Sequence, residues 1–166
     1  MDIQIRNVEA EDAKGIINIL NPMIETGIYT VFAKLLSEDE ERDFILNFPK
    51  RGVFNIAFCD KSNNILGFQD IMPFETFTGA FNHVGVIATY VDIRYHRQGI
   101  SKKLFEASFK KARDRGYEKL FTYVRADNQK GLSAYLFQGF KVIGTARKQA
   151  KLNGKYIDEI FIEKFL

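Results

Sequence analysis

Residues 90–104 combine an apolar run, a basic turn and a helix start, a combination suited to holding a phosphate group. The apolar, β-branched run ends in a charged turn, and a helix is predicted to open at Gly99. Backbone N–H groups at a helix N-terminus are free, and the helix dipole favours negative charge there. Gly99 has no side chain, so a phosphate can approach the backbone closely. Arg97, Lys102 and Lys103 can add charge-assisted contacts. The pattern predicts a phosphate-binding turn; the alternative is an ordinary helix start with a solvated basic edge.

Two other phosphate-binding motifs are absent from the sequence. The chain contains no Gly-x-Gly-x-x-Gly and no Gly-x-x-x-x-Gly-Lys-Ser/Thr. The dinucleotide-binding fingerprint and the P-loop are therefore both missing.

A second segment, residues 128–140, follows the next predicted strand and gives the turn a context. Together the two segments resemble the GNAT superfamily of N-acetyltransferases, whose acyl-CoA turn has the pattern Gln/Arg-x-x-Gly-x-Gly/Ala. The later segment of that family runs Asn, a small residue, Tyr and Gly-Phe. Asn128, Gly131, Tyr135, Gly139 and Phe140 fall at those spacings. Neither motif is specific singly, but both occur in order and at the right separation.

The resemblance implies a fold, a co-substrate and an activity. The expected fold is α/β (α+β): a mixed, mostly antiparallel central sheet flanked by helices, with a splayed pair of central parallel strands. The expected co-substrate is acetyl-CoA. The expected reaction moves an acetyl group from acetyl-CoA to a primary amine of a small molecule. A homodimer is compatible with the resemblance.

The resemblance also assigns roles to residues. A backbone N–H at Val91, or at a residue next to it, is expected to hold the thioester oxygen, as in an oxyanion hole. Tyr135 is expected to protonate the leaving thiolate as general acid; the alternative is a half-buried ring that packs on Phe140. The residues expected to bind acetyl-CoA are Tyr90, Val91, Arg97, Gln98, Gly99, Ile100, Ser101, Lys102 and Asn128.

The chain departs from the family pattern in three ways. His96 stands where the family has Gln or Arg, and Ser101 stands where it has Gly or Ala. Because the contacts at this turn are made largely by backbone N–H groups, we expect binding to survive. The central strand also has no Glu that could act as general base. The remaining candidates for the base are His83, Glu75, Asp70 and Asp158.

A finer resemblance links the chain to the subgroup that acetylates phosphinothricin and amino acids. It rests on the strand end at Tyr90 and Val91, on residues 125–129 and 154–158, and on the loop of residues 21–29. It implies a small amine or amino acid as acceptor. Two alternatives stay open: acetylation of a protein N-terminus or lysine, and an acyl-CoA-binding regulator without turnover.

Composition bounds the remaining possibilities. The 166 residues suit a single domain over residues 1–166, and a net charge of +3 does not indicate nucleic-acid binding. One cysteine, Cys59, excludes a disulfide within the chain, and with only two histidines a structural zinc site is not expected. No apolar run approaches the ~20 residues that span a bilayer, and we interpret the protein as cytoplasmic.

Periodicity predicts the elements that position these residues. Expected helices cover residues 12–22, beginning at Asp12 and ending near Pro22, then 37–48, with a capping box at Ser37 and Glu40, 99–115 and 128–137. Expected strands cover residues 3–6, 53–60, 65–72, 84–91, 120–124, 140–146 and 156–165, with a turn at 62–64. The nearly all-apolar strand 84–91 is expected to be covered on both faces.

Overall fold

The computed structural model of the protein describes residues 2–60 and 64–166. Its strands are β1 (Ile3–Asn7), β2 (Val53–Cys59), β3 (Ile65–Pro73), β4 (Val84–Val91), β5 (Lys119–Arg125), β6 (Lys141–Leu152) and β7 (Lys155–Phe165). Its α-helices are α1 (Ala13–Thr26), α2 (Glu38–Leu46), α3 (Ile100–Asp114) and α4 (Gln129–Phe137). Within these residues, no helix is both long enough and apolar enough to cross a membrane.

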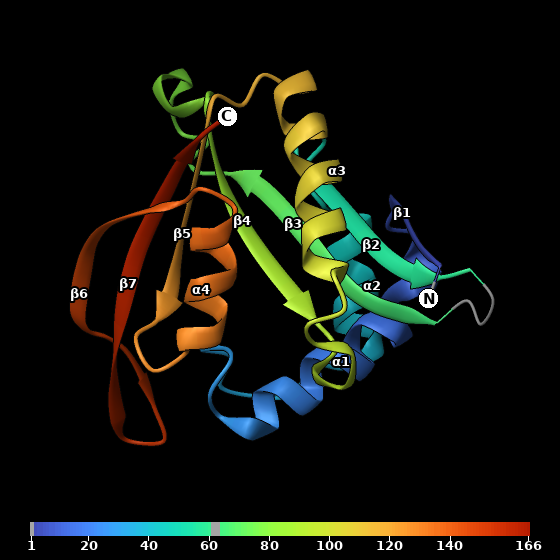
Figure 1. The fold of residues 1–166 in the computed structure, drawn as a ribbon, viewed down its shortest axis with the longest axis horizontal. Helices are drawn as coiled ribbons and strands as arrows, with labels where there is room; N and C mark the ends of the chain where they lie inside the picture. Colours follow the sequence, from blue (N-terminus) through green and yellow to red (C-terminus); the bar gives the residue numbers. More distant parts are fainter. Residues whose placement is uncertain (1, 61–63) are drawn as a thin grey trace.

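The strands form a seven-stranded sheet in the order β1-β2-β3-β4-β5-β7-β6. Neighbouring strands run antiparallel except β4 and β5, which are parallel. This parallel pair is matched only at its start, where Val84, Gly85 and Val86 face Lys119, Leu120 and Phe121. Beyond Val86 the two strands diverge, as Figure 1 shows. The predicted fold class and its splayed central pair are therefore confirmed.

Helices cover both faces of the sheet. On one face, α1 packs with Phe54, Ile56 and Phe68 of β2 and β3. On the other, α3 and α4 bury a core that includes Phe105 and Tyr135 together with strand residues. In Figure 1, α4 lies in front of the space where β4 and β5 separate. The two central strands therefore separate at the middle of the sheet, with α4 on one face and the α1–α2 region on the other.

Local sequence patterns predicted some helix ends correctly and others wrongly. The capping box at Ser37 is confirmed: its Oγ accepts the N–H of Glu40 at 3.1 Å, and its own N–H donates to the Glu40 carboxylate at 2.8 Å. The predicted end of α1 near Pro22 is wrong, because the helix continues to Thr26 and ends at Gly27, whose φ is +66°. Proline removes one hydrogen bond from the helix, but residues on both sides of Pro22 are buried against the sheet and keep the helix intact.

Asp12 does not cap α1 as predicted. Its side chain makes no capping bond to that helix. Instead its carboxylate accepts two hydrogen bonds from Arg6, at 2.7 and 2.8 Å, and the backbone N–H of Glu9 at 2.8 Å. The ion pair ties β1 to the short 3-10 turn at Ala10–Asp12, a contact that helix-start rules do not consider.

The strands differ from the expectation in two respects. Of β4, only Gly85 and Ile87 are fully buried, because the divergence from β5 leaves the rest of the strand beside a cavity rather than under a packed layer. The last two strands are longer than predicted, because they extend into a hairpin that turns at Asn153 and Gly154, both at positive φ. The turn predicted at 62–64 falls on residues 62 and 63, which lie outside the described ones.

Candidate active site

A cavity of about 310 Å³ occupies the space between the diverging strands. Its walls come from β4 at residues 86–90, β5 at residues 122–125, the α1–α2 loop at residues 29–32, and from Asn128, Gly131, Tyr135 and Glu159. A second cavity of about 340 Å³ shares Thr30, Phe32 and Arg125 with it and extends to the β6–β7 hairpin. Small-molecule sites commonly have such volumes. Of the predicted site residues, Tyr90, Asn128 and Tyr135 line the first cavity.

The free edge of β4 presents backbone groups to this cavity. The N–H of Asp92 donates to the carbonyl of Leu66 in β3, at 2.9 Å. Since backbone groups alternate sides along a strand, the N–H groups of Ile87, Thr89 and Val91 point the other way, into the gap left by β5. Of the candidates around Val91, it is therefore Val91 itself whose N–H faces the gap, while those of its two neighbours face β3.

His96 holds the end of this free edge. Its Nε2 lies 3.0 Å from the carbonyl oxygen of Val91. A carbonyl can only accept, so Nε2 carries the hydrogen and donates. The His96 ring also meets Tyr29 edge-on, with 6.0 Å between ring centroids. The departure from the family pattern at His96 therefore supplies a contact between the turn, β4 and the α1–α2 loop.

The turn before α3 has the free backbone donors that a phosphate site needs. Gly99 has φ +80°, and its open side has no atom within 4 Å of where a Cβ would stand. The N–H groups of Gly99, Ile100, Ser101 and Lys102 make no hydrogen bond within the described residues. The first helical bond runs from the N–H of Lys103 to the carbonyl of Gly99, at 3.2 Å. The free backbone N–H groups predicted for this helix N-terminus are therefore present.

The side chains of the turn divide into two groups. Those of Arg97, Gln98 and Lys102 are exposed and can reach a ligand. That of Ile100 is buried in the core, so this residue can offer only its N–H. Lys103, which the sequence suggested as a further cation, instead donates from Nζ to the carbonyl of Ile3 at 2.9 Å.

Tyr135 belongs to a chain of hydroxyl and amide groups beneath β4. Its hydroxyl donates to the Oγ1 of Thr89 at 2.9 Å, and the Nε2 of Gln69 donates to the same oxygen at 2.8 Å. Because both lone pairs of the Thr89 Oγ1 accept hydrogen bonds, the hydroxyl hydrogen of Thr89 remains available for a third partner. Burial raises the pKa of Tyr135 above its ordinary value, so the phenol is neutral and holds its proton at physiological pH. Thr89 was not predicted; no local pattern marks it.

Tyr90 points to the opposite face of the sheet. Its ring stacks on Phe68 with 4.8 Å between centroids and packs in the core under α1. Burial raises the pKa of its hydroxyl as well. Tyr90 therefore lines the cavity on the side of the α1–α2 loop, whereas Tyr135 lines it on the side of α4.

Asn128 caps α4 from the wall of the cavity. Its Oδ1 accepts the N–H of Gly131 at 2.9 Å. A Cβ at Gly131 would lie 2.6 Å from the Asn128 Nδ2, so the close approach requires a glycine. The Nδ2 group makes no hydrogen bond to any described residue and remains available as a donor.

None of the four predicted general-base candidates lines the cavity. His83 and Glu75 are exposed near the opposite end of β4, where it begins. Asp158 accepts the backbone N–H of Lys148 at 2.7 Å and so stabilises the β6–β7 pair. Asp70 lies on β3, opposite Ala88, and close enough to Tyr90 and Tyr135 to raise the pKa of both hydroxyls. The carboxylate that does line the cavity is Glu159, which the sequence analysis missed.

Asp70 makes the stability of the fold depend on pH. Burial, and then the neighbouring Glu41 carboxylate, raise the pKa of Asp70 to about 7. Because this exceeds the unfolded value of about 3.9, stability present at low pH is lost as pH rises through about 7. We expect Asp70→Asn to melt at a higher temperature than the unmodified protein, and the difference should be larger at pH 8 than at pH 5. Each kcal/mol of added stability corresponds to about 2–4 °C. Thermal unfolding at both pH values checks this; an equal difference at both would contradict it.

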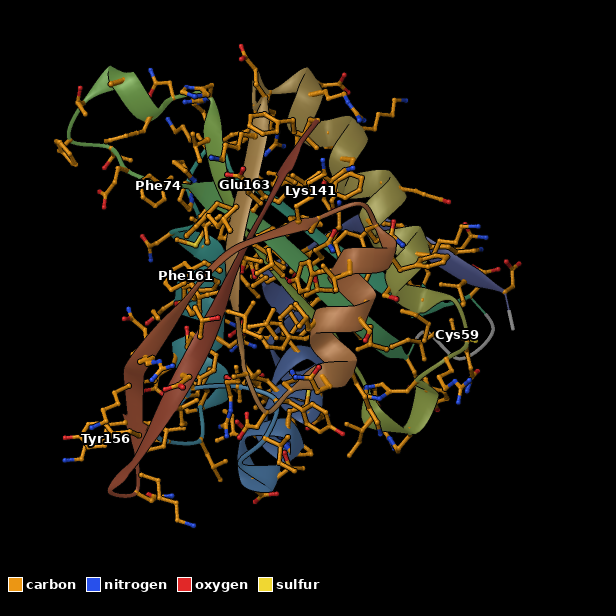
Figure 2. All side chains as sticks on the ribbon, turned by 60° about the vertical axis from the view of Figure 1, so that its left-hand side comes forward. Cys59, Phe74, Lys141, Tyr156, Phe161 and Glu163 are labelled. Atoms are coloured by element: carbon orange, nitrogen blue, oxygen red, sulfur yellow. The ribbon has the colours of Figure 1, made fainter. Side chains whose placement is uncertain are left out.

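Cys59 plays no part in the cavity. It lies at the end of β2, and neither cavity includes it. Figure 2 shows it on the opposite side of the molecule from Phe161 and Glu163 of β7. A nucleophilic role for this thiol therefore has no support in the geometry.

The splayed parallel pair, the free N–H groups before α3 and the tyrosine on α4 are the features expected of an acyl-CoA-dependent acetyltransferase. The chain belongs to the acetyltransferase (GNAT) family, whose sequence profile matches residues 23–140. Family membership makes acetyl-CoA the acyl donor, as predicted.

Individual proteins resemble the chain over nearly its full length. A phosphinothricin N-acetyltransferase of Streptomyces coelicolor is 21% identical over 98% of this chain and 96% of its own. An L-methionine sulfoximine/L-methionine sulfone acetyltransferase of Pseudomonas aeruginosa is 22% identical over 98% of this chain and 94% of its own. The structure of a phosphinothricin acetyltransferase from Sinorhizobium meliloti in complex with acetyl-CoA matches with a TM-score of 0.89, at 17% identity, over 100% of this chain and 89% of its own. These relatives agree with the predicted subgroup.

Proposed function

We propose that this acetyltransferase moves an acetyl group from acetyl-CoA to the primary amine of a small, amino-acid-like molecule. The observation that carries the proposal is the cavity between β4 and β5, which is walled by α4 on one side and by the α1–α2 loop on the other. Its volume of about 310 Å³ suits a small acceptor better than a peptide segment. Two relatives are named for acceptors of that kind.

The residues present fit acetyl-CoA. The free N–H groups at residues 99–102 and the exposed side chains of Arg97, Gln98 and Lys102 would hold its phosphates. Ser101 can add its hydroxyl to the same site. The N–H groups of the free β4 edge and the Nδ2 of Asn128 would hold the arm of acetyl-CoA that carries its amide groups.

When bound, acetyl-CoA supplies an acyl group activated as a thioester. The N–H of Val91 would stabilise negative charge on the thioester oxygen, because it faces the gap and has no strand partner there. The Tyr135 hydroxyl would supply the proton that the departing sulfur needs. Thr89, which holds that hydroxyl at 2.9 Å, positions it or relays its proton.

Asn128 offers a test of the arm-binding assignment. Asn128→Asp keeps the oxygen that caps α4 but removes the Nδ2 donor, so the helix should stay capped while one hydrogen bond to acetyl-CoA is lost. A lost hydrogen bond is worth about 0.5–1.5 kcal/mol, and we expect acetyl-CoA affinity to fall by about 2–10-fold with little change in acceptor KM. Calorimetry with acetyl-CoA and steady-state kinetics check this. An effect confined to acceptor KM would instead place Asn128 at the acceptor.

The function itself is tested by thiol release from acetyl-CoA in the presence of candidate acceptors. Amino acids and their analogues, including L-methionine sulfone and phosphinothricin, are compared with polyamines and with lysine-containing or N-terminal peptides. We expect release with amino-acid-like amines. Release only with peptides would favour the protein-acetylating alternative, and acetyl-CoA binding without release in any mixture would favour the regulator.

A further inference from the structure

Glu159 is a buried carboxylate that lines the cavity between β4 and β5. It lies on β7 opposite Arg125 of β5 and is 2% exposed. Its strand neighbours Ile160 and Ile162 pack into the core on the α3–α4 side. Because side chains alternate along a strand, Glu159 points to the other face, toward the α1–α2 loop, where it lines the cavity.

Among the described residues the carboxylate of Glu159 has no hydrogen-bond or ion-pair partner; burial raises its pKa, and the charge of the nearby Arg125 lowers it. The nearest cation, Arg125, is committed elsewhere: its Nε and Nη2 donate to Asp127 at 2.9 and 2.7 Å, and its Nη1 donates to the carbonyl of Thr30 at 3.0 Å. An unpaired buried charge is strongly unfavourable. A carboxylate that lies unpaired in the wall of a cavity is therefore suited to binding a cationic ligand.

Glu159 and the charged groups around it carry a net negative charge. Arg125 forms an ion pair with Asp127 and its charge also acts on Glu159, so one guanidinium stands beside two carboxylates. Apart from Arg125, the other titratable groups that line this cavity are phenols, those of Tyr29, Tyr90, Tyr123 and Tyr135. On β6 the partner of Glu159 is Ala146, which carries no charge.

We propose that the Glu159 carboxylate receives the ammonium group of the acceptor and takes its proton before attack. This inference rests on the proposed function and identifies the acceptor as a molecule that enters the site as a cation. One proton moves from the ammonium nitrogen to a Glu159 oxygen, and the freed lone pair forms the C–N bond as the C–S bond breaks. The sulfur leaves with the proton of Tyr135. The acylated nitrogen loses its second proton to solvent and becomes an amide, Glu159 releases its proton to solvent, and Tyr135 is reprotonated from solvent.

Glu159→Gln tests the proposal, with Glu163→Gln as the matched control. Glu163 lies on the same face of β7, pairs with Lys119 and is outside both cavities. With the unmodified protein and the control, kcat/KM for the best amine of the screen should agree. With Glu159→Gln it should fall at least about 100-fold, while the Kd for acetyl-CoA stays within about twofold. Burial raises the pKa of Glu159, so the fall in kcat/KM toward low pH should disappear in Glu159→Gln.

A binding experiment keeps this inference separate from the proposed function. In the presence of coenzyme A, calorimetry compares each amine of the panel with its counterpart bearing hydroxyl in place of amine. The unmodified protein should prefer the amine by about tenfold or more, and Glu159→Gln should lose that preference. If no amine supports thiol release but this preference is found, the proposed function fails, and only the binding of an ammonium group by Glu159 stands.

Two results would overturn the assignment. One is turnover in Glu159→Gln equal to that of the control, and the other is an unmodified protein with no preference for amines over hydroxyl counterparts. Folding provides the check on a structural role. Removing an unpaired buried charge should leave the melting temperature at pH 8 equal or higher, whereas a lower melting temperature together with unchanged kcat/KM would make Glu159 a structural residue.

Discussion

Replacing Gly99 with aspartate should abolish acetyl-CoA binding. The new carboxylate would stand on the open side of the turn, where no atom lies within 4 Å of the Cβ position. It would face the phosphates that we propose the free N–H groups bind. Like charges brought together in this way cost several kcal/mol, so the Kd for acetyl-CoA should rise at least about 100-fold. Isothermal titration with acetyl-CoA measures it. Binding equal to that of the unmodified protein would show that the phosphates lie elsewhere.

Gly116→Asp is the control for this experiment. Gly116 follows the other end of the same helix, has φ +83°, and also has no atom within 4 Å of its Cβ position. Both substitutions therefore place aspartate in the left-handed region, at a cost of about 1–2 kcal/mol. The two variants should lose similar stability, and only Gly99→Asp should lose acetyl-CoA.

Removing the Tyr135 hydroxyl should slow the chemical step and leave acetyl-CoA binding nearly unchanged. Tyr135→Phe keeps the ring that packs edge-on against Phe105 and Phe140, with centroid distances of 5.4 and 5.1 Å. General-acid assistance is typically worth about 10²–10⁴-fold, so we expect kcat to fall by at least about tenfold. Pre-steady-state thiol release distinguishes the chemical step from product release.

Tyr117→Phe controls for the loss of a buried phenol. Tyr117 is 2% exposed in the same core cluster, and its hydroxyl donates to the carbonyl of Arg51 at 3.2 Å, away from the cavity. Its variant should lose some stability and keep kcat. Near-normal kcat in Tyr135→Phe would leave Tyr135 as a packing residue and make water or the Thr89 hydroxyl the proton donor.

Patterns within about a dozen residues were enough to predict a large part of this protein. The capping box at Ser37 and the helix starts at Gly99 and Asn128 each depend on residues three or four positions apart, so the chain itself brings the partners together. The same holds for the alternation that marks most strands. Pro22 and Asp12 show the limit of this reasoning, because burial of α1 and an ion pair from β1 outweighed the local preference.

The chemistry of the site depends on contacts that no local pattern contains. Tyr135 and Thr89 are 46 residues apart, and their hydrogen bond exists because the sheet register places β4 beneath α4. Glu159 sits in an ordinary-looking strand, and only the order β4-β5-β7 brings it to the cavity.

The sequence by itself therefore determined the turn that opens α3, the capping box at Ser37 and the family. The tertiary structure decided which strand edge is free, which hydroxyl meets Tyr135 and which carboxylate lines the cavity. The physical reason is that β4 and β5 pair over three residues and then separate. That separation creates the cavity at which the distant residues meet.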